Sequence, residues 1–274
     1  MTDLSALLTP GVLVDALLAV ALAVGLLIRI QGPTLDRRVV LASLPWVAAG
    51  AALHALDGVV AYPSPLSVLV GLPWAYLLAV TLGGLVWLLL TAVLDPAVRS
   101  VRPRYFGVTG LGVLLALTTA LVVHHGLAAP AFLAVWLSAP IVAAFVTYVL
   151  MFGLGVWMPD SGYFAGSAGA ALVFALAIDG IGTALALAFR RVVSPLGLPL
   201  GTNVPPLSGI AHPLAVVVAI VWLRLILAVA VLGGLAALDR RRPTVAERGL
   251  ELATVATGVV AANTFLVALG GGFA

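Results

Sequence analysis

The sequence of 274 residues contains no cysteine and no lysine, so all 13 of its basic residues are arginine. Without cysteine the chain cannot form disulfides, bind a metal through thiolates or use a thiol nucleophile. Without lysine it cannot hold retinal as a Schiff base. That absence excludes the retinal proteins, which a bundle of seven or eight helices would otherwise suggest.

Charge of either sign is also scarce. Charged residues make up only 8% of the chain and hydrophobic residues 63%, whereas a soluble globular protein is about a quarter charged. This composition excludes a soluble enzyme, a nucleic-acid-binding protein and a disordered chain. The alternating pattern typical of β-barrel strands is absent as well. We therefore expect an all-α, multi-pass protein of the cell membrane, with the lipid bilayer as its main partner and no nucleic acid.

Long apolar runs predict eight transmembrane helices, since a span takes about 20 apolar residues. Residues 1–6 carry Asp3 and no basic residue, whereas a cleavable signal peptide begins with positive charge. We therefore expect the first apolar run to be a retained helix. The eight predicted helices cover residues 10–29, 39–62, 66–94, 106–123, 127–151 (with an extension as far as Trp157), 167–189, 213–238 and 250–269.

Most of the arginines gather in three predicted loops, which follow the first, third and seventh helices. In an eight-helix chain these loops share one side of the membrane, and the opposite side carries only Arg190 and Arg191. Because basic loops stay in the cytoplasm, we expect both termini to be extracytoplasmic. The loop arginines are Arg29, Arg37, Arg38, Arg99, Arg102, Arg104, Arg240, Arg241, Arg242 and Arg248.

Short repeated motifs predict two four-helix halves, residues 1–126 and 127–274. ALDGV at 55–59 matches AIDGI at 177–181, and PLS occurs at 65–67 and again at 206–208. The third and seventh helices both end in Leu-Asp. A four-helix unit keeps its orientation when duplicated, so the halves would be parallel repeats, with Asp57 and Asp179 facing each other. The alternative is chance similarity between segments rich in Ala, Leu, Val and Gly.

Charges inside the predicted spans are candidates for function, because a charge in the bilayer costs several kcal/mol unless it faces a cavity or a partner. At 1.5 Å per residue, Asp57 and Asp179 lie about 28 Å, and Arg224 about 22 Å, from the cytoplasmic charges on their helices. We expect Arg224 to pair with Asp57, with Asp179 or with both. Two carboxylates against one guanidinium would leave a negative charge for a cation, a proton or a polar donor. The alternative is a purely structural ion pair between the sixth and seventh helices.

Further polar residues fall in the same outer layer. His54 lies one helical turn before Asp57, a spacing at which an aspartate orients an imidazole base or shares a metal with it. Asp15 in the first helix and Asn263 in the eighth are additional candidates for binding. A protein metal site needs three or four ligands, and His124, His125 and His212 lie at the predicted interface. We therefore predict no metal site and no cofactor, haem included.

Two segments carry a resemblance to a known family. HALDG at 54–58, with Pro63 and LPWAY at 72–76, and DGIGT at 179–183 resemble the Asp-Gly, Pro-Xaa-Xaa-Tyr and Asp-Ala-Xaa-Xaa-Thr motifs of an archaeal membrane-protein family of unknown function, DUF63. The chain departs from the family at Gly180, in RVVSP at 191–195, which lacks a glutamate and a histidine, and in its last helix. It is identified as a divergent member, and the resemblance implies topology and origin only.

Three functions follow from these residues. The first is a carrier or channel-like protein with an outward-opening polar site at Asp57, Asp179 and Arg224, for a small molecule or an ion. The second is an intramembrane enzyme for lipid or isoprenoid head groups, in which His54 and Asp57 form an acid–base pair. The third is a structural subunit of a membrane complex. The chain lacks a nucleotide-binding loop, a prenyltransferase-type aspartate motif and a Ser/His/Asp arrangement.

Overall fold

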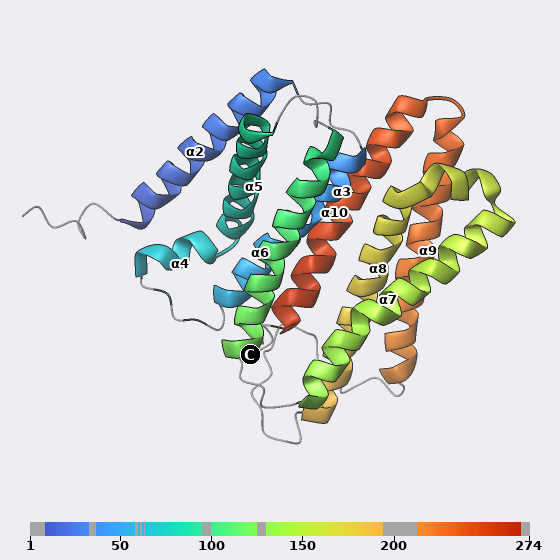
Figure 1. Ribbon diagram of the computed structural model, residues 1–274. Helices are drawn as coiled ribbons and strands as arrows, with labels where there is room; N and C mark the ends of the chain where they lie inside the picture. Colours follow the sequence, from blue (N-terminus) through green and yellow to red (C-terminus); the bar gives the residue numbers. More distant parts are fainter. Residues whose placement is uncertain are drawn as a thin grey trace, which may run out of the picture. The chain divides into compact units, whose positions relative to one another are not determined.

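A computed structural model describes residues 9–32, 37–57, 60, 62, 64–94, 100–124, 130–193 and 213–269 of the protein. Within these ranges the structure contains α-helices and no β-strand (Figure 1). In chain order they are α2 (Pro10–Gln31), α3 (Arg37–Asp57), α4 (Ser64–Val70), α5 (Trp74–Val93), α6 (Arg102–His124), α7 (Pro130–Trp157), α8 (Pro159–Val193), α9 (Pro213–Asp239) and α10 (Pro243–Leu269).

Eight of these helices are long and apolar enough to cross a membrane; only α4, with seven residues, is too short. The predicted all-α class and the eight spans are thereby confirmed for the described part of the chain, and the composition marks it as a multi-pass membrane protein. Five of the helices, α2, α7, α8, α9 and α10, begin at a proline. Proline suits the first helical position because a backbone N–H there would have no hydrogen-bond partner within the helix, so its absence costs nothing.

The predicted bounds of one helix, residues 66–94, are wrong. The structure divides it into α4 and α5, with a turn at Gly71, Leu72 and Pro73. Proline has no N–H to donate and its ring crowds the preceding turn, so a continuous helix cannot easily pass through Pro73. A second correction concerns α3, which ends at Asp57 rather than at Tyr62.

The sixth predicted helix begins too late. Helix α8 starts at Pro159, eight residues before the predicted start, and contains a break at Gly166, where φ is 47° and ψ is −143°. Only glycine adopts these angles readily, so the break has a cause in the sequence. The helix also runs on to Val193, so Arg190 and Arg191 belong to it rather than to a loop. Helix α10 likewise begins seven residues before its predicted start.

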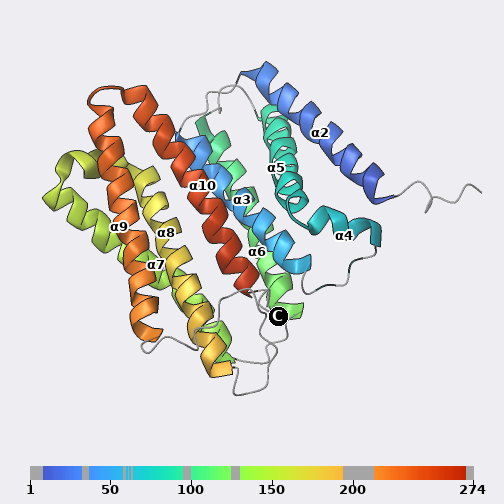
Figure 2. The same ribbon diagram turned by 180° about the vertical axis from the view of Figure 1, so that it is seen from behind.

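The chain divides into two compact units, residues 1–126 and 127–274. Unit 1 is organised around α3, which packs against α5 and α6, while α2 packs on α5 (Figures 1 and 2). The indole of Trp46 on α3 fills this contact. Its Nε1 donates a hydrogen bond to the Phe106 carbonyl at 3.1 Å, and Gly83 and Gly110 leave room for the ring on α5 and α6.

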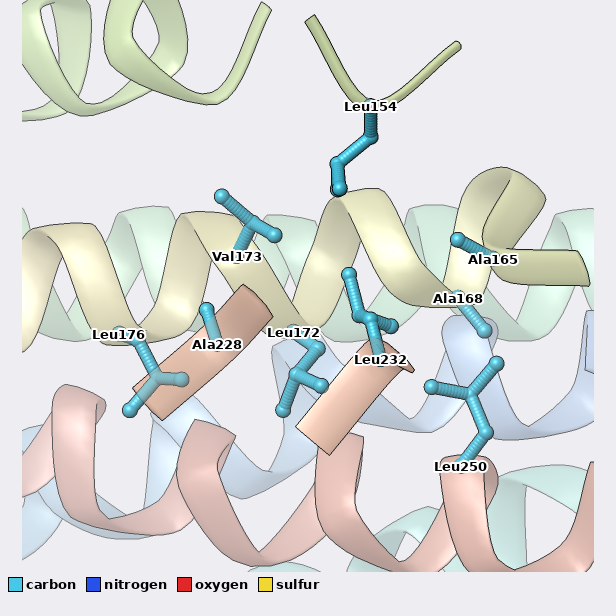
Figure 3. Close-up of a cluster of buried hydrophobic side chains, with 9 residues drawn as sticks. All are labelled: Leu154, Ala165, Ala168, Leu172, Val173, Leu176, Ala228, Leu232 and Leu250. Atoms are coloured by element: carbon cyan, nitrogen blue, oxygen red, sulfur yellow. The ribbon is translucent and has the colours of Figure 1, made fainter. Parts of the chain in front are cut away.

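Unit 2 is organised around α8, which packs against α7, α9 and α10. Apolar side chains fill its centre (Figure 3). Thr254 on α10 adds a polar link, because its hydroxyl donates both to Leu250 of its own helix and to the Ala168 carbonyl of α8. The buried cluster consists of Leu154, Ala165, Ala168, Leu172, Val173, Leu176, Ala228, Leu232 and Leu250.

The two units share part of their helix packing. In each, the second membrane-length helix (α3 or α8) packs against the third and the fourth. They differ in their first helix, since α2 packs on the third helix of unit 1 whereas α7 packs on the second helix of unit 2. The duplication into parallel repeats therefore stays a prediction, as does the facing arrangement of Asp57 and Asp179.

Candidate functional site

The central feature of unit 2 is an ion pair between α8 and α9. The Arg224 guanidinium lies 3.0 Å from Asp179 Oδ2, and the two side chains are 36% and 3% exposed, respectively. The pair is one of the combinations that the sequence predicted. Oδ2 is buried and accepts no hydrogen bond of good geometry from the described residues, so this contact is an ion pair by distance. A buried polar oxygen without a hydrogen bond is rare in proteins and needs a physical explanation.

A glycine beside Asp179 brings the two helices together. A Cβ atom at Gly180 would lie 3.4 Å from the Val221 Cα and 3.4 Å from the Arg224 Cγ. The α9 backbone and the stem of the arginine therefore rest directly on the backbone of α8. A small residue that permits close helix approach is typical of membrane helix packing. Here it lets the guanidinium reach a carboxylate on the neighbouring helix.

Helix α10 packs against α8 about one turn beyond Asp179. A Cβ atom at Gly182 would lie 3.8 Å from the Phe265 Cα. Asn263, two residues before Phe265, is half-buried, and its role in binding stays a prediction. The Thr183 hydroxyl donates to the Asp179 carbonyl at 2.8 Å. Polar side chains of α8, α9 and α10 thus share one layer of unit 2.

The side of this layer toward Arg240 is closed by the apolar cluster. Leu176 lies three residues before Asp179, and Ala228 lies four residues after Arg224; both belong to the cluster (Figure 3). Beyond the cluster, Arg240, which directly follows α9, forms a second ion pair with Asp160 of α8, with side chains 71% and 73% exposed. The buried and the exposed ion pairs are therefore separated by a packed apolar core.

Unit 1 contains two further predicted residues, His54 and Asp57, at the end of α3. They lie one turn apart on one face of the helix, but the structure shows no ion pair between them. The His54 Nδ1 atom is buried and finds no hydrogen-bond partner among the described residues. The acid–base pair that an intramembrane enzyme would need therefore stays a prediction. Among the residues that the structure describes, no group of three or more His, Asp or Glu side chains is placed to hold a metal.

Two residues around Asp57 were not singled out from the sequence. A Cβ atom at Gly71 would lie 4.0 Å from Asp57 Oδ2, so the carboxylate reaches the turn between α4 and α5. Burial raises the pKa of Tyr62 above its ordinary value of 10.0, and the negative charge of Asp57 raises it further. Five positions apart in a continuous helix, Asp57 and Tyr62 would point in different directions. Because α3 ends at Asp57, the chain brings Tyr62 back toward the carboxylate.

The remaining candidates lie on other helices of unit 1 or outside the described residues. Asp15 is exposed and sits five residues into α2, and the structure shows no ion pair for it within the described ranges. His124 is exposed at the end of α6. His125 and His212 lie outside the described residues, as do the long connection 194–212 and the PLS segment at 206–208; the PLS segment at 65–67 belongs to α4.

Asp57 belongs to unit 1 and Arg224 to unit 2, so the pairing of these two residues also stays a prediction. Membership of the DUF63 family likewise stays a prediction. Comparisons with protein-family models, with curated proteins and with solved structures find no match to this chain, so its function has to be inferred from the residues of the site.

Proposed function

We propose that the protein is a membrane carrier whose site at Asp179 and Arg224 binds a small anionic solute that also carries a hydrogen-bond donor. One observation carries this proposal: the ion pair leaves hydrogen-bonding capacity open on both of its partners. Asp179 Oδ2 accepts no hydrogen bond from the described residues. A guanidinium has five N–H donors, of which the contact with Asp179 engages one nitrogen only.

The exposure of the arginine supports a ligand rather than a closed salt bridge. An arginine within a membrane span is costly unless water, a ligand or a partner solvates it, yet the Arg224 side chain is 36% exposed. Its free N–H groups suit a carboxylate or phosphate, which arginine binds with directional hydrogen bonds. Asp179 would accept a hydrogen bond from a hydroxyl, an amine or a protonated oxygen of the same solute.

The packing on the Arg240 side supports access from the other side. A solute moving toward Arg240 would have to pass Leu176, Ala228 and Leu232, which are all buried in the core of unit 2. A carrier closed on one side of its site and open on the other matches the arrangement expected for alternating access. If the arginine-rich loops are cytoplasmic, the site opens outward.

A ligand panel on the purified protein in detergent tests the proposal. Lactate and propionate carry the same charge, but only lactate adds a hydroxyl donor; inorganic phosphate offers a P–OH donor. Ligand binding to the folded state adds about 2.7 kcal/mol of stability at 100 times the Kd. We expect lactate or phosphate to raise the thermal unfolding temperature and propionate to have a smaller effect.

The variants decide where such binding occurs. Arg224→Met combined with Asp179→Leu should abolish the stabilisation by anions. Arg240→Met, which removes an exposed arginine just after the same helix, should retain it. If none of these anions stabilises the parent protein, or if the double variant responds like the parent, the proposed binding site is wrong.

A second candidate function is favoured by the depth of Asp179. With 3% exposure and one arginine as its partner, the pair is suited to a structural role that fixes α8 to α9, as in a subunit of a membrane complex. In that case the joint replacement by apolar residues should leave folding and complex formation intact, and no anion should bind. Co-purification of the parent and the double variant with the same partners would support this second function.

A further inference from the structure

We propose that the end of unit 2 at which α7 meets α8 binds the head group of an anionic phospholipid. Three features identify this partner: exposed aromatic side chains at the helix junction, exposed arginines in the adjoining turn between α9 and α10, and an exposed apolar face of α7 that leads away from them. All three belong to unit 2. The inference goes beyond the carrier function and does not depend on it.

The segment that joins α7 to α8 runs across the end of these helices. Helix α8 is broken at Gly166, and its part before the break crosses the ends of α7 and α8 instead of following their direction (Figure 1, yellow-green). Glycines keep the junction tight, because a Cβ atom at Gly162 would lie only 2.9 Å from the Gly155 Cα of α7. If α7 and α8 span the bilayer, this segment lies along its surface.

The two faces of this segment differ in burial. Ser161 and Ala165 are buried against unit 2, with 5% and 0% exposure, whereas Trp157 and Tyr163 are 85% and 94% exposed. Tryptophan and tyrosine are enriched at the boundary between bilayer and water, where the ring meets lipid and the N–H or O–H group meets the polar head groups. The exposed face therefore has the composition of a surface at the level of the lipid head groups.

Three consecutive arginines lie in the turn between α9 and α10, beside this segment. The ion pair of Arg240 with Asp160 joins the turn to the start of α8. Arg241 and Arg242 are exposed, and the structure shows no ion pair for either of them among the described residues. Arginine binds a phosphate group through directional hydrogen bonds, and basic residues next to a membrane span attract anionic lipids.

Acidic residues do not cancel the charge of the turn itself. Between residues 236 and 246 the sequence has three arginines and one acid, Asp239, and Asp160 adds a second acid from α8. Glu247 and Glu251 lie four and eight residues after the start of α10, which corresponds to about 6 and 12 Å along the helix. The turn is therefore left with a net positive charge, which is complementary to an anionic head group.

An exposed apolar stripe on α7 leads away from the junction. Phe145, Tyr148, Phe152 and Val156 are three or four residues apart and so share one face of the helix. Their side chains are 62% to 69% exposed, and the rings of Tyr148 and Phe152 stack with their centroids 6.4 Å apart. The stripe ends one residue before Trp157. A single phospholipid would satisfy both parts of this surface, with its acyl chains along the stripe and its phosphate beside the arginines.

Native mass spectrometry of the purified protein tests the choice of lipid. The protein is offered phosphatidylglycerol and phosphatidylcholine with the same acyl chains, and we expect it to retain phosphatidylglycerol in preference. The ratio of the two bound lipids should fall about ten-fold in Arg241→Gln combined with Arg242→Gln, since each arginine beside an anionic head group strengthens the attraction severalfold. The matched control, Arg38→Gln combined with Arg104→Gln, removes two exposed arginines of unit 1 and should keep the ratio of the parent.

The control outcomes separate this surface from a general attraction of charge. Equal losses in the two double variants, or no preference for phosphatidylglycerol in the parent, would overturn the inference. So would full displacement of phosphatidylglycerol by inorganic phosphate at constant ionic strength, because the arginines would then bind a free anion. Asp179→Leu combined with Arg224→Met should keep the ratio, so a failure of the carrier proposal is distinguishable.

A depth measurement keeps all arginines in place and does not depend on the folding of the arginine variants. The chain has no cysteine, so a spin label on Tyr163→Cys reports its own position in nanodiscs that contain phosphatidylglycerol. Phe145→Cys, 12 residues before Trp157 on the exposed face of α7, is the control. We expect oxygen and a water-soluble nickel complex to place the label of Tyr163→Cys at the lipid phosphates and that of Phe145→Cys in the hydrocarbon core. A Tyr163→Cys label in bulk water or in the hydrocarbon core would contradict the inference.

Discussion

Asp179 on α8 and Arg224 on α9 lie 3.0 Å apart, and a second ion pair, between Asp160 and Arg240, lies 19 residues before this aspartate on α8. Both acids belong to α8, whereas Arg224 lies within α9 and Arg240 directly follows its last residue. Only the Asp179 carboxylate is buried. The separation along the helices, about 24 to 28 Å at 1.5 Å per residue, is close to the thickness of the hydrocarbon core. The two ion pairs therefore differ in environment although their chemistry is the same.

The first prediction is that the two ion pairs contribute very differently to stability. Removing one partner of a buried pair leaves an uncompensated charge and costs about 3–5 kcal/mol. We expect Asp179→Leu to approach this cost, Arg224→Met to cost less because the side chain is partly exposed, and the double variant to regain most of the loss. An exposed pair contributes about 0–1 kcal/mol, so Asp160→Asn should have little effect. Reversible unfolding in mixed micelles measures all four; equal losses for Asp160→Asn and Asp179→Leu would contradict the assignment of burial.

The second prediction concerns the glycine that lets α9 approach α8. A Cβ atom at Gly180 would make contacts of 3.4 Å, so Gly180→Ala should be tolerated and should gain up to about 1 kcal/mol from helix propensity. Gly180→Leu should cost about 1–3 kcal/mol through overpacking and should displace Arg224 from Asp179. Unfolding free energies of both variants check this order, and a stable Gly180→Leu protein would show that the helices do not touch here.

The third prediction concerns the core of unit 1. A Cβ atom at Gly110 would lie 2.6 Å from Trp46 Nε1, whereas one at Gly112, on the same helix, would meet nothing within 4 Å. Gly110→Ala should therefore destabilise the protein by about 1–3 kcal/mol, and the matched control Gly112→Ala should be neutral or slightly stabilising. Combining Gly110→Ala with Trp46→Leu should cost less than the sum of the two. Thermal unfolding of this set decides whether the indole occupies the proposed space.

The fourth prediction is a dependence on alkaline pH that arises from Tyr62, which lies outside the spanning helices. Its pKa is raised in the folded protein, first by burial and then by the charge of Asp57. The unfolded chain therefore loses the phenolic proton first, near pH 10, and the stability falls as the pH rises from there through the higher folded value. Tyrosinate absorbance in the parent minus that in Tyr62→Phe follows this group. Asp57→Asn should move the titration downward but leave it above the ordinary value, because burial remains the larger cause.

The number and class of the helices are predictable from the sequence, because apolar runs of about 20 residues report directly on the bilayer. The helix ends are less predictable where glycine or proline acts inside an apolar run. Pro73 interrupts the run 66–94 without any polar signal. Gly166 breaks α8 but does not end it, so the segment from Pro159 to Ala165 looks like a loop in the sequence although it is helical.

The site is predictable in its charged residues only. Asp179 and Arg224 stand out because charge is rare in this chain, and their pairing follows from their similar depth on neighbouring helices. The role of Gly180 as the contact between helix backbones depends on the rotation of α9 about its axis, which the sequence does not specify. Tyr62 is not predictable as a neighbour of Asp57, because a helix continued to residue 62 would direct its side chain away from the carboxylate.

The aligned Asp-Gly motifs show how the two units differ in charge. Leu176 stands three residues before Asp179, where His54 stands before Asp57, and it is buried in the apolar cluster of unit 2. In unit 2 an arginine on the neighbouring helix balances the aspartate.

In the proposed carrier, an aqueous solute reaches Asp179 and Arg224 from one side of the membrane. Because the chain contains no cysteine, single cysteines report access without background. Thr183→Cys lies one turn beyond Asp179, and Ala228→Cys, at a position with 0% exposure, serves as the control in the core. The measurement is the rate of modification by membrane-impermeant anionic and cationic thiosulfonates added to either side of oriented vesicles.

We expect Thr183→Cys to react only from the side opposite Arg240, and Ala228→Cys to react from neither side. We also expect Arg224→Met to lower the rate ratio of the anionic to the cationic reagent several-fold, since the guanidinium attracts anions to the site. If Thr183→Cys is unreactive from both sides, or if the rate ratio does not depend on Arg224, the pair is enclosed by lipid and protein and is not a solute-binding site.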